Sequence, residues 1–172
     1  MHNIVIVGFM GTGKTVIAKK LSKELGKKYV STDDIIEKRE GKKITEIFQG
    51  NGEAYFRKTE KEVVKEVSRK ADQVIDAGGG VVLDKENMAN LKKGGVIICL
   101  WADPETILER TRSHGHRPLL NVADPLGKIK ELLESRRPFY EKADFHVDTT
   151  KGKIDSVVER IKEITYGEKE ES

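Results

Sequence analysis

Residues 4–15 read IVIVGFMGTGKT, an apolar run that leads directly into a glycine-rich loop ending in Lys-Thr. The apolar part predicts a buried strand, and the residues after Thr15 continue in a helical pattern. Between them, Gly11 and Gly13 allow backbone conformations that a Cβ would forbid, so that successive N–H groups can surround a phosphate. The sequence therefore predicts a phosphate-binding loop between a strand and a helix.

This loop contains the groups that a nucleoside triphosphate and its metal ion require. The backbone amides and the positive end of the following helix form an anion cradle. The Lys14 ammonium can reach the β- and γ-phosphates, and the Thr15 hydroxyl can ligate Mg²⁺. The predicted ATP contacts in the loop are Gly11, Thr12, Gly13, Lys14, Thr15 and Val16.

Length and composition describe one charged globular domain. The chain has 172 residues, of which 35% are charged and 37% hydrophobic, so we expect a single domain over residues 1–166 and a disordered tail over 167–172. The 32 basic and 29 acidic residues are too balanced to predict a nucleic-acid partner. Without a long apolar run or a signal-peptide pattern, we expect no membrane partner and a cytoplasmic location.

Four further apolar runs predict strands that alternate with helical patterns. These strands are Lys28–Ser31, Gln73–Asp76, Gly95–Trp101 and residues 144–147. The alternation predicts an α/β fold, a three-layer sandwich around a parallel sheet of about five strands, with the phosphate loop after the first strand.

The helices have recognisable ends. The first is expected at Lys14–Leu25, where Gly26 suits a left-handed C-cap. A long helix is expected over residues 53–70, and Asp103-Pro104 fits the start of another. Residues 112–123 have little periodicity and lie between two helices, which predicts a mobile lid, with an ordinary surface loop as the alternative.

The residues that follow the second and third strands are candidates for binding a second ligand, because ligands bind at the carboxyl ends of parallel strands. Asp33 follows the second strand. Gly78, Gly79 and Gly80 follow the third, and three consecutive glycines remove every side chain from one patch of backbone. This pattern favours close approach of a small molecule.

Six motifs stand in order along most of the chain. They are GFMGTGKT at 8–15, Asp33 followed by IIE, GEAYFR at 52–57, GGG at 78–80, RPLL at 117–120 and RRPFY at 136–140. With these motifs the chain resembles shikimate kinases, which share their structural group with the nucleoside monophosphate kinases. The resemblance implies transfer of the ATP γ-phosphoryl group to the 3-hydroxyl of shikimate, in the biosynthesis of aromatic amino acids.

The resemblance also implies how shikimate is held. Arg57 and Arg136 match the arginines that bind its carboxylate, and a planar guanidinium suits that role because it pairs with a carboxylate through two hydrogen bonds. Asp33 matches the carboxylate beside the reacting hydroxyl, either as general base or as a positioning group. Gly79 and Gly80 match backbone donors to the substrate, and Gly78 of the same run is also expected to contact it.

On the nucleotide side, Arg117 matches a lid arginine that offsets charge in the transition state, so the implied catalytic set is Asp33, Lys14 and Arg117. Arg110 resembles the residue that packs on the adenine ring, although Arg112 is equally well placed.

The chain departs from the family where magnesium is held. The family usually has an aspartate at the position of Ser31, and a neutral hydroxyl is a weaker ligand to Mg²⁺ or its waters. Asp76 ends the third strand, and we hypothesise that it supplies the missing carboxylate alongside Thr15. Alternatively, Asp76 caps the next turn.

Two other functions remain open at this point. A kinase for a different acceptor, such as gluconate or a nucleoside monophosphate, is the first, because two arginines and a carboxylate can also hold other anionic polyols. A regulatory module that binds ATP without transferring phosphate is the second, and only Ser31 favours it. For a shikimate kinase we expect a monomer.

Overall fold

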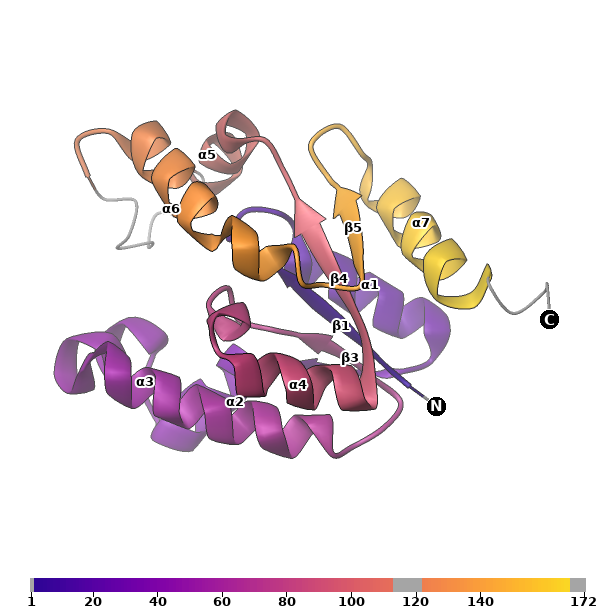
Figure 1. The fold of residues 1–172 in the computed structure, drawn as a ribbon, viewed down its shortest axis with the longest axis horizontal. Coiled ribbons are helices and arrows are strands. Elements are labelled where there is room, and N and C mark those ends of the chain that lie inside the picture. The colour runs from indigo at the N-terminus through magenta and orange to yellow at the C-terminus, as the bar shows by residue number, and fades with distance from the viewer. Residues whose placement is uncertain (1, 113–121, 168–172) are drawn as a thin grey trace.

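A five-stranded parallel sheet forms the centre of the protein, as a computed structural model that describes residues 2–112 and 122–167 shows (Figure 1). Its strands are β1 (Asn3–Gly8), β2 (Lys28–Ser31), β3 (Gln73–Asp76), β4 (Gly95–Trp101) and β5 (Phe145–Asp148). The strand order is β2-β3-β1-β4-β5, and every neighbouring pair is parallel. The predicted α/β class and the parallel sheet are therefore confirmed.

Helices connect the strands. Within the described residues they are α1 (Lys14–Leu25), α2 (Thr32–Glu40), α3 (Ile44–Ser68), the short 3-10 helix η1 (Val81–Leu83), α4 (Lys85–Gly94), α5 (Pro104–Arg112), α6 (Pro125–Tyr140) and α7 (Ile154–Tyr166). Since β1 lies in the middle of the sheet, the loop after it opens at the centre of the carboxyl edge.

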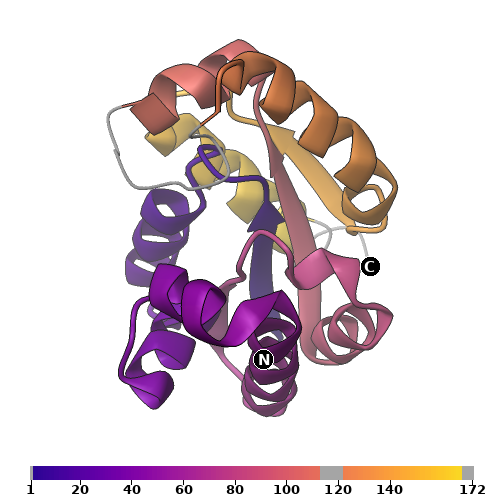
Figure 2. The same ribbon diagram turned by 90° about the vertical axis from the view of Figure 1, so that its left-hand side faces the viewer.

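Alternate residues of β1 face two separate cores, which makes the fold a three-layer sandwich. Val5 and Val7 pack with side chains from α2, α3, α4 and α6, whereas Ile4 and Ile6 pack with α1 and α7. Figures 1 and 2 show these two helical layers on opposite faces of the sheet. Burial of each such side chain stabilises the fold by about 1.5–3 kcal/mol, so the strand that carries the phosphate loop is firmly held.

The predicted helix over residues 53–70 is the second half of a longer element. α3 begins at Ile44, but Gly52 has φ 84° and ψ 168°, so the helix is interrupted there and resumes at Glu53. Only a glycine adopts this conformation readily, which explains why the sequence indicated a start at this point. The first helix ends as predicted, with Gly26 in the left-handed region at φ 65°.

α3 ends at Ser68, before the predicted end at residue 70, and two other boundaries also differ from the predictions. β5 covers Phe145–Asp148, one residue later than predicted, because Asp144 uses its carboxylate to accept a hydrogen bond from the Ile97 N–H. Gly167, the first residue of the predicted tail, still donates to the Glu163 carbonyl at the end of α7. Most of the predicted lid, Arg117 included, and residues 168–172 lie outside the described residues.

No helix within residues 2–112 and 122–167 is both long enough and apolar enough to span a membrane.

Candidate active site

The phosphate loop after β1 has the backbone that its glycines predict. Gly8 has φ 146°, and a Cβ there would lie 2.6 Å from the Leu100 carbonyl oxygen of the neighbouring strand. Gly11 has φ 75°, and a Cβ would lie 3.0 Å from a methyl group of Thr111 in α5. Both positions therefore require glycine, which leaves the loop packed closely between β4 and α5 with its amides uncovered by side chains.

The Lys14 side chain lies across the phosphate loop, where it is predicted to bind the β- and γ-phosphates. Its ammonium donates to the carbonyl oxygens of Gly8 at 2.8 Å and Phe9 at 3.3 Å. The buried Thr12 hydroxyl also donates to the Phe9 carbonyl, at 2.7 Å. These hydrogen bonds bend the loop back on itself, and α1 begins at Lys14 directly after the bend. Val16 is exposed in the first turn of α1.

Arg110 holds the loop from the side. Its guanidinium donates to the Gly11 carbonyl at 3.1 Å and to the Thr149 carbonyl at 2.6 Å. The Thr149 hydroxyl donates in turn to the Thr12 carbonyl at 2.9 Å. Arg110 thus joins α5, the loop after β5 and the phosphate loop, whereas Arg112 is exposed. An adenine contact by Arg110 stays a prediction.

Asp76 faces the phosphate loop from the end of β3. Its Oδ2 accepts hydrogen bonds from the Thr15 hydroxyl at 2.8 Å and the Tyr29 hydroxyl at 2.9 Å. Burial and the Asp76 charge raise the pKa of Tyr29, which keeps its hydroxyl a donor. The carboxylate therefore points toward Thr15, and the bonds that it accepts come from α1 and β2.

Ser31 is the partner of Asp76 in the parallel register of β2 and β3. The Ser31 hydroxyl accepts a hydrogen bond from the Asp34 N–H at 3.2 Å and so caps α2. Ser31 therefore stabilises the start of α2, although it lacks the carboxylate of the usual aspartate. The residue opposite Ser31 on β3, Asp76, carries a carboxylate.

Each of the three glycines after β3 faces one of the predicted acceptor-binding side chains. A Cβ on Gly78 would lie 2.7 Å from Asp33 Oδ1, and one on Gly79 would lie 3.6 Å from Arg136 Nη1. A Cβ on Gly80 would overlap the guanidinium of Arg57. We call Asp33, Arg57, Arg136 and these glycines the acceptor cluster. The sequence places its members in four separate segments, and the fold brings them together.

Glu60 belongs to the same cluster, although the sequence reasoning did not identify it. It is only 1% exposed, and its Oε1 accepts a hydrogen bond from Arg57 Nη1 at 2.8 Å. Burial raises the pKa of Glu60, while the charge of Arg57 opposes the rise. The signal in the sequence was the Arg57-Glu60 spacing of three residues, which puts both side chains on one helical face.

Asp33 lies between the two halves of the site. Burial raises the pKa of its carboxyl group, the Lys14 ammonium lowers it, and the Asp76 carboxylate raises it further. A carboxylate with a raised pKa is a stronger base than one in water, which suits a group that faces a reacting hydroxyl.

Arg136 reaches the cluster from α6. Its guanidinium lies over the ring of Phe9 in the phosphate loop, 5.6 Å from the centroid. Four residues later, the Tyr140 hydroxyl donates to the Gly79 carbonyl at 3.0 Å. α6 therefore contacts both the phosphate loop and the three glycines after β3. Neither Phe9 nor Tyr140 was predicted as part of the site.

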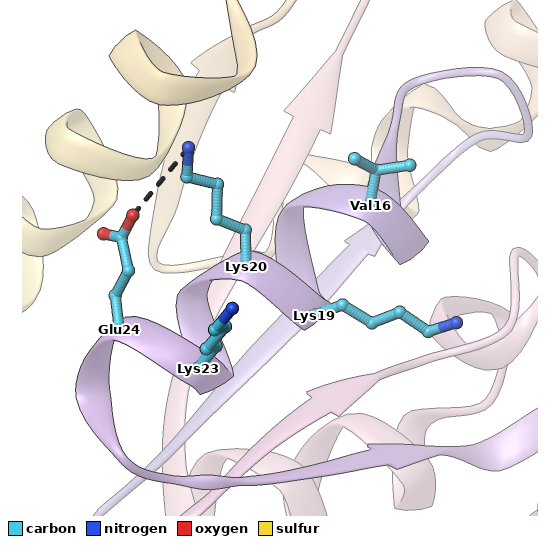
Figure 3. A pocket seen from close by; sticks show the side chains of 5 residues that line it. All are labelled: Val16, Lys19, Lys20, Lys23 and Glu24. Atoms are coloured by element: carbon cyan, nitrogen blue, oxygen red, sulfur yellow. Dashed lines mark ion pairs between the residues drawn. The ribbon is translucent and has the colours of Figure 1, made fainter.

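A separate hollow of about 740 Å³ lies on the outer face of α1, lined by Val16, Lys19, Lys20, Lys23 and Glu24 (Figure 3). In Figure 3 Lys20 points to Glu24, with Nζ 3.8 Å from Oε1, and Lys20 also pairs with Asp155. The charge of Lys20 is therefore already paired with two acidic side chains, and the hollow lies apart from the phosphate loop and the acceptor cluster.

Strand order, phosphate loop and acceptor cluster together define a phosphate-loop kinase that acts on a small molecule. A family model described as shikimate kinase matches residues 10–165 of the chain. The chain therefore belongs to the shikimate kinase family, whose members use ATP to phosphorylate shikimate in aromatic biosynthesis.

Known proteins similar to the chain agree with this membership. It is 51% identical over 161 residues to a shikimate kinase of Thermodesulfovibrio yellowstonii, covering 94% of this chain and 93% of the relative. Identity to a shikimate kinase of Caldanaerobacter subterraneus is 48%, with 94% of each chain covered. The solved structure of Acinetobacter baumannii shikimate kinase in complex with shikimate matches with a TM-score of 0.93 at 33% identity, covering 98% of this chain and 95% of that one.

Proposed function

We propose that the acceptor cluster binds shikimate and that the phosphate loop presents ATP to its 3-hydroxyl. The observation that carries this proposal is the pairing of each glycine after β3 with Asp33, Arg136 or Arg57. Two guanidinium groups and one carboxylate around side-chain-free backbone fit a small ring with a carboxylate at one end and hydroxyls at the other.

The two ends of the acceptor are bound by opposite charges. Arg57 and Arg136 pair with its carboxylate, and Glu60 holds the Arg57 guanidinium in position. Asp33 accepts the hydrogen bond of the reacting hydroxyl and removes its proton as the new phosphate ester forms. Phosphoryl transfer depends chiefly on alignment and charge stabilisation, so this positioning is the main contribution of the cluster.

The nucleotide is bound by the backbone of the loop. Gly11, Thr12, Gly13 and Val16 contribute amides, and Lys14 exchanges its loop carbonyls for the β- and γ-phosphates, where its charge offsets that of the transition state. From the sequence we propose that Arg117 adds a second positive charge and excludes water, and that Arg110 contacts the adenine base.

The residues present fit a magnesium ion held largely by the nucleotide. The Thr15 hydroxyl donates its hydrogen bond to Asp76, which leaves the lone pairs of the Thr15 oxygen available to a cation. When bound, Mg²⁺ would neutralise charge on the β- and γ-phosphates. Among the described residues no three acidic, cysteine or histidine side chains form a metal cluster, which suits an ion whose other ligands are phosphate and water. We propose Thr15 as a ligand and Asp76 as the carboxylate behind it.

A coupled assay of ADP release tests this function. Shikimate should stimulate ADP release strongly, and gluconate or a nucleoside monophosphate should not. Arg136→Ala should raise the KM for shikimate at least about tenfold without changing ATP affinity, because a charge-assisted pair is lost. Arg137→Ala is the matched control, since Arg137 is exposed and its ion pair with Glu134, at 3.9 Å, is long and also exposed.

Two other results would contradict the proposal. Stimulation by gluconate or a nucleoside monophosphate in place of shikimate would identify a different acceptor. ATP binding without any acceptor-dependent release of ADP would identify a regulatory module. We further propose that the enzyme works as a monomer in the cytoplasm without nucleic-acid partners, and sedimentation at assay concentration tests the monomer.

A further inference from the structure

We infer that Tyr140 is a positioning residue for the acceptor, acting through the peptide group between Gly79 and Gly80. The inference rests on the proposed placement of shikimate in the acceptor cluster. It starts from one contact, the hydrogen bond from the Tyr140 hydroxyl to the Gly79 carbonyl at 3.0 Å.

A trans peptide group points its carbonyl and its N–H in opposite directions. Described peptides of the chain are all trans, so fixing the Gly79 carbonyl also fixes the direction of the Gly80 N–H. No hydrogen bond joins the N–H of Gly79 or of Gly80 to another residue in the described part of the chain. Gly80 is buried and lies against Arg57, so its N–H is an unpartnered donor inside the acceptor cluster.

Glycine backbone has no side chain to restrict its peptide planes, so consecutive glycines need an external contact to hold them. Gly78 has one, because its N–H donates to the Thr32 hydroxyl at 3.0 Å. The Val81 N–H donates to the Gly78 carbonyl at 3.0 Å and holds the following peptide. Tyr140 provides the contact for the Gly79–Gly80 peptide, which presents a donor to the acceptor.

Tyr140 is built as a rigid support for this contact. Its side chain is 1% exposed, and the Trp101 ring packs edge-on against it with centroids 5.9 Å apart. Its backbone carbonyl contacts the His146 ring nitrogen at 3.0 Å, which fixes the end of α6. A buried tyrosine requires a partner for its hydroxyl, and here the partner is the glycine run.

The position of Tyr140 on α6 also links the two ends of the acceptor. Arg136 lies four residues earlier on the same helix, so both side chains point to the same side of α6. One helix therefore places a guanidinium that binds the carboxylate and fixes a backbone donor for the acceptor. The distance between these two groups sets which ring the cluster accepts.

Tyr140→Phe removes one oxygen atom and tests the inference in steady-state kinetics. We expect the KM for shikimate to rise about three- to tenfold, as for loss of one fixed hydrogen bond, while the KM for ATP stays within about twofold. Trp101→Phe is the control for packing, because it loosens the aromatic contact and keeps the Tyr140 hydroxyl. Tyr166→Phe, at the exposed end of α7, is the control for the substitution type.

Three results would overturn the role of Tyr140. These are a shikimate KM in Tyr140→Phe within twofold of the wild type, an equal rise of both KM values, or the same rise in Trp101→Phe. None of them affects the proposed function, which fails only if the wild-type protein does not use shikimate.

Should Tyr140→Phe not fold, amide NMR of the wild-type protein gives an independent answer. Addition of shikimate should move the Gly80 amide proton downfield as its N–H gains an acceptor. An unchanged Gly80 resonance at saturating shikimate would also overturn the inference.

Discussion

The Thr15 hydroxyl donates to Asp76 Oδ2 at 2.8 Å, which joins the first turn of α1 to the carboxyl end of β3. Asp76 lies beside Ser31 in the sheet register, so the carboxylate is displaced by one strand from the position where the family usually has it. The direction of this hydrogen bond suits the proposed role of the Thr15 oxygen as a metal ligand. We therefore propose that metal binding in this chain depends on Asp76.

Asp76→Asn tests that dependence. An amide supplies no negative charge to attract the cation, although its oxygen can still accept a hydrogen bond from Thr15, so the affinity for Mg²⁺ should fall about 10- to 100-fold. The concentration of Mg²⁺ that gives half-maximal turnover should rise by the same factor. Binding of Mn²⁺ to the enzyme with ADP, followed by electron paramagnetic resonance, measures the affinity without turnover.

The chain offers two controls for this substitution. Asp155→Asn changes an exposed carboxylate on α7 and should leave the metal dependence unaltered. Ser31→Asp in the Asp76→Asn background restores a carboxylate on β2 while keeping a residue that caps α2, so it should recover most of the Mg²⁺ affinity. An Asp76→Asn enzyme with wild-type Mg²⁺ dependence would show that Asp76 has no part in metal binding.

The sequence predicted the fold because its local signals and its topology agree. The apolar runs give the strands almost to the residue, and Gly26 and Gly52 mark a helix end and a helix start through φ values that disfavour other residues. The site residues at the strand ends were also predictable, since parallel strands bring their carboxyl ends to one edge.

Contacts that depend on side-chain direction were not predictable. Glu60 reads as one charge among many on α3, and only the packed structure shows that it is buried against Arg57. Tyr140 reads as an ordinary core aromatic, because nothing in the sequence tells where its hydroxyl points. The hydrogen bond from Arg110 to the phosphate loop depends on α5 packing against the loop after β1, which brings together segments far apart in the sequence.

Gly80→Ala should impair shikimate binding without unfolding the protein. Its φ of −97° is open to alanine, but the added Cβ overlaps the guanidinium of Arg57, the flexible end of a side chain that can move away. Displacing Arg57 costs the acceptor a charge-assisted pair, so the KM for shikimate should rise at least about tenfold. Kinetics for each substrate and a thermal melt check the expected pattern.

Gly50→Ala is the matched control, because Gly50 is exposed on α3 outside the acceptor cluster and an added Cβ there meets no atom within 4 Å. We expect a change of no more than about threefold in the KM for shikimate. Equal effects of the two substitutions would show that backbone flexibility, and not the position of Arg57, controls binding.

Asp33→Asn should stabilise the protein at pH 7 while reducing turnover at least about 100-fold, as for loss of a general base. Burial raises the folded-state pKa of Asp33 above its usual value of 3.8, so the fold disfavours the ionised form. The favourable contribution of the neutral carboxyl is complete below pH 3.8 and is lost as the pH rises through the raised pKa. The variant should therefore melt higher than the wild type at pH 7, and the gap should close in acid.

Asp34→Asn separates this effect from a general change of charge. Asp34 is exposed in the first turn of α2, where a negative charge favours the helix, so its removal should lower the melting temperature slightly and leave turnover intact. In the wild type, kcat/KM should decline as the pH falls through the raised pKa of Asp33. A melting temperature of Asp33→Asn below that of the wild type at pH 7 would contradict the buried-charge explanation.

Arg110→Ala should weaken nucleotide binding through the shape of the phosphate loop. The substitution removes the donors to the Gly11 and Thr149 carbonyls, so the loop loses its link to α5 and the segment after β5. We expect the KM for ATP to rise about tenfold and the free energy of unfolding to fall by about 1–3 kcal/mol, while the KM for shikimate changes little.

Arg112→Ala is the control, and it should change neither the KM for ATP nor the free energy of unfolding, because Arg112 is exposed at the end of α5. Titration with ADP in a calorimeter, together with denaturant unfolding of both variants, compares them directly. Loss of ATP affinity with unchanged stability would instead assign Arg110 to contact with the base alone, since a residue that only stacks on a ligand does not stabilise the loop in its absence.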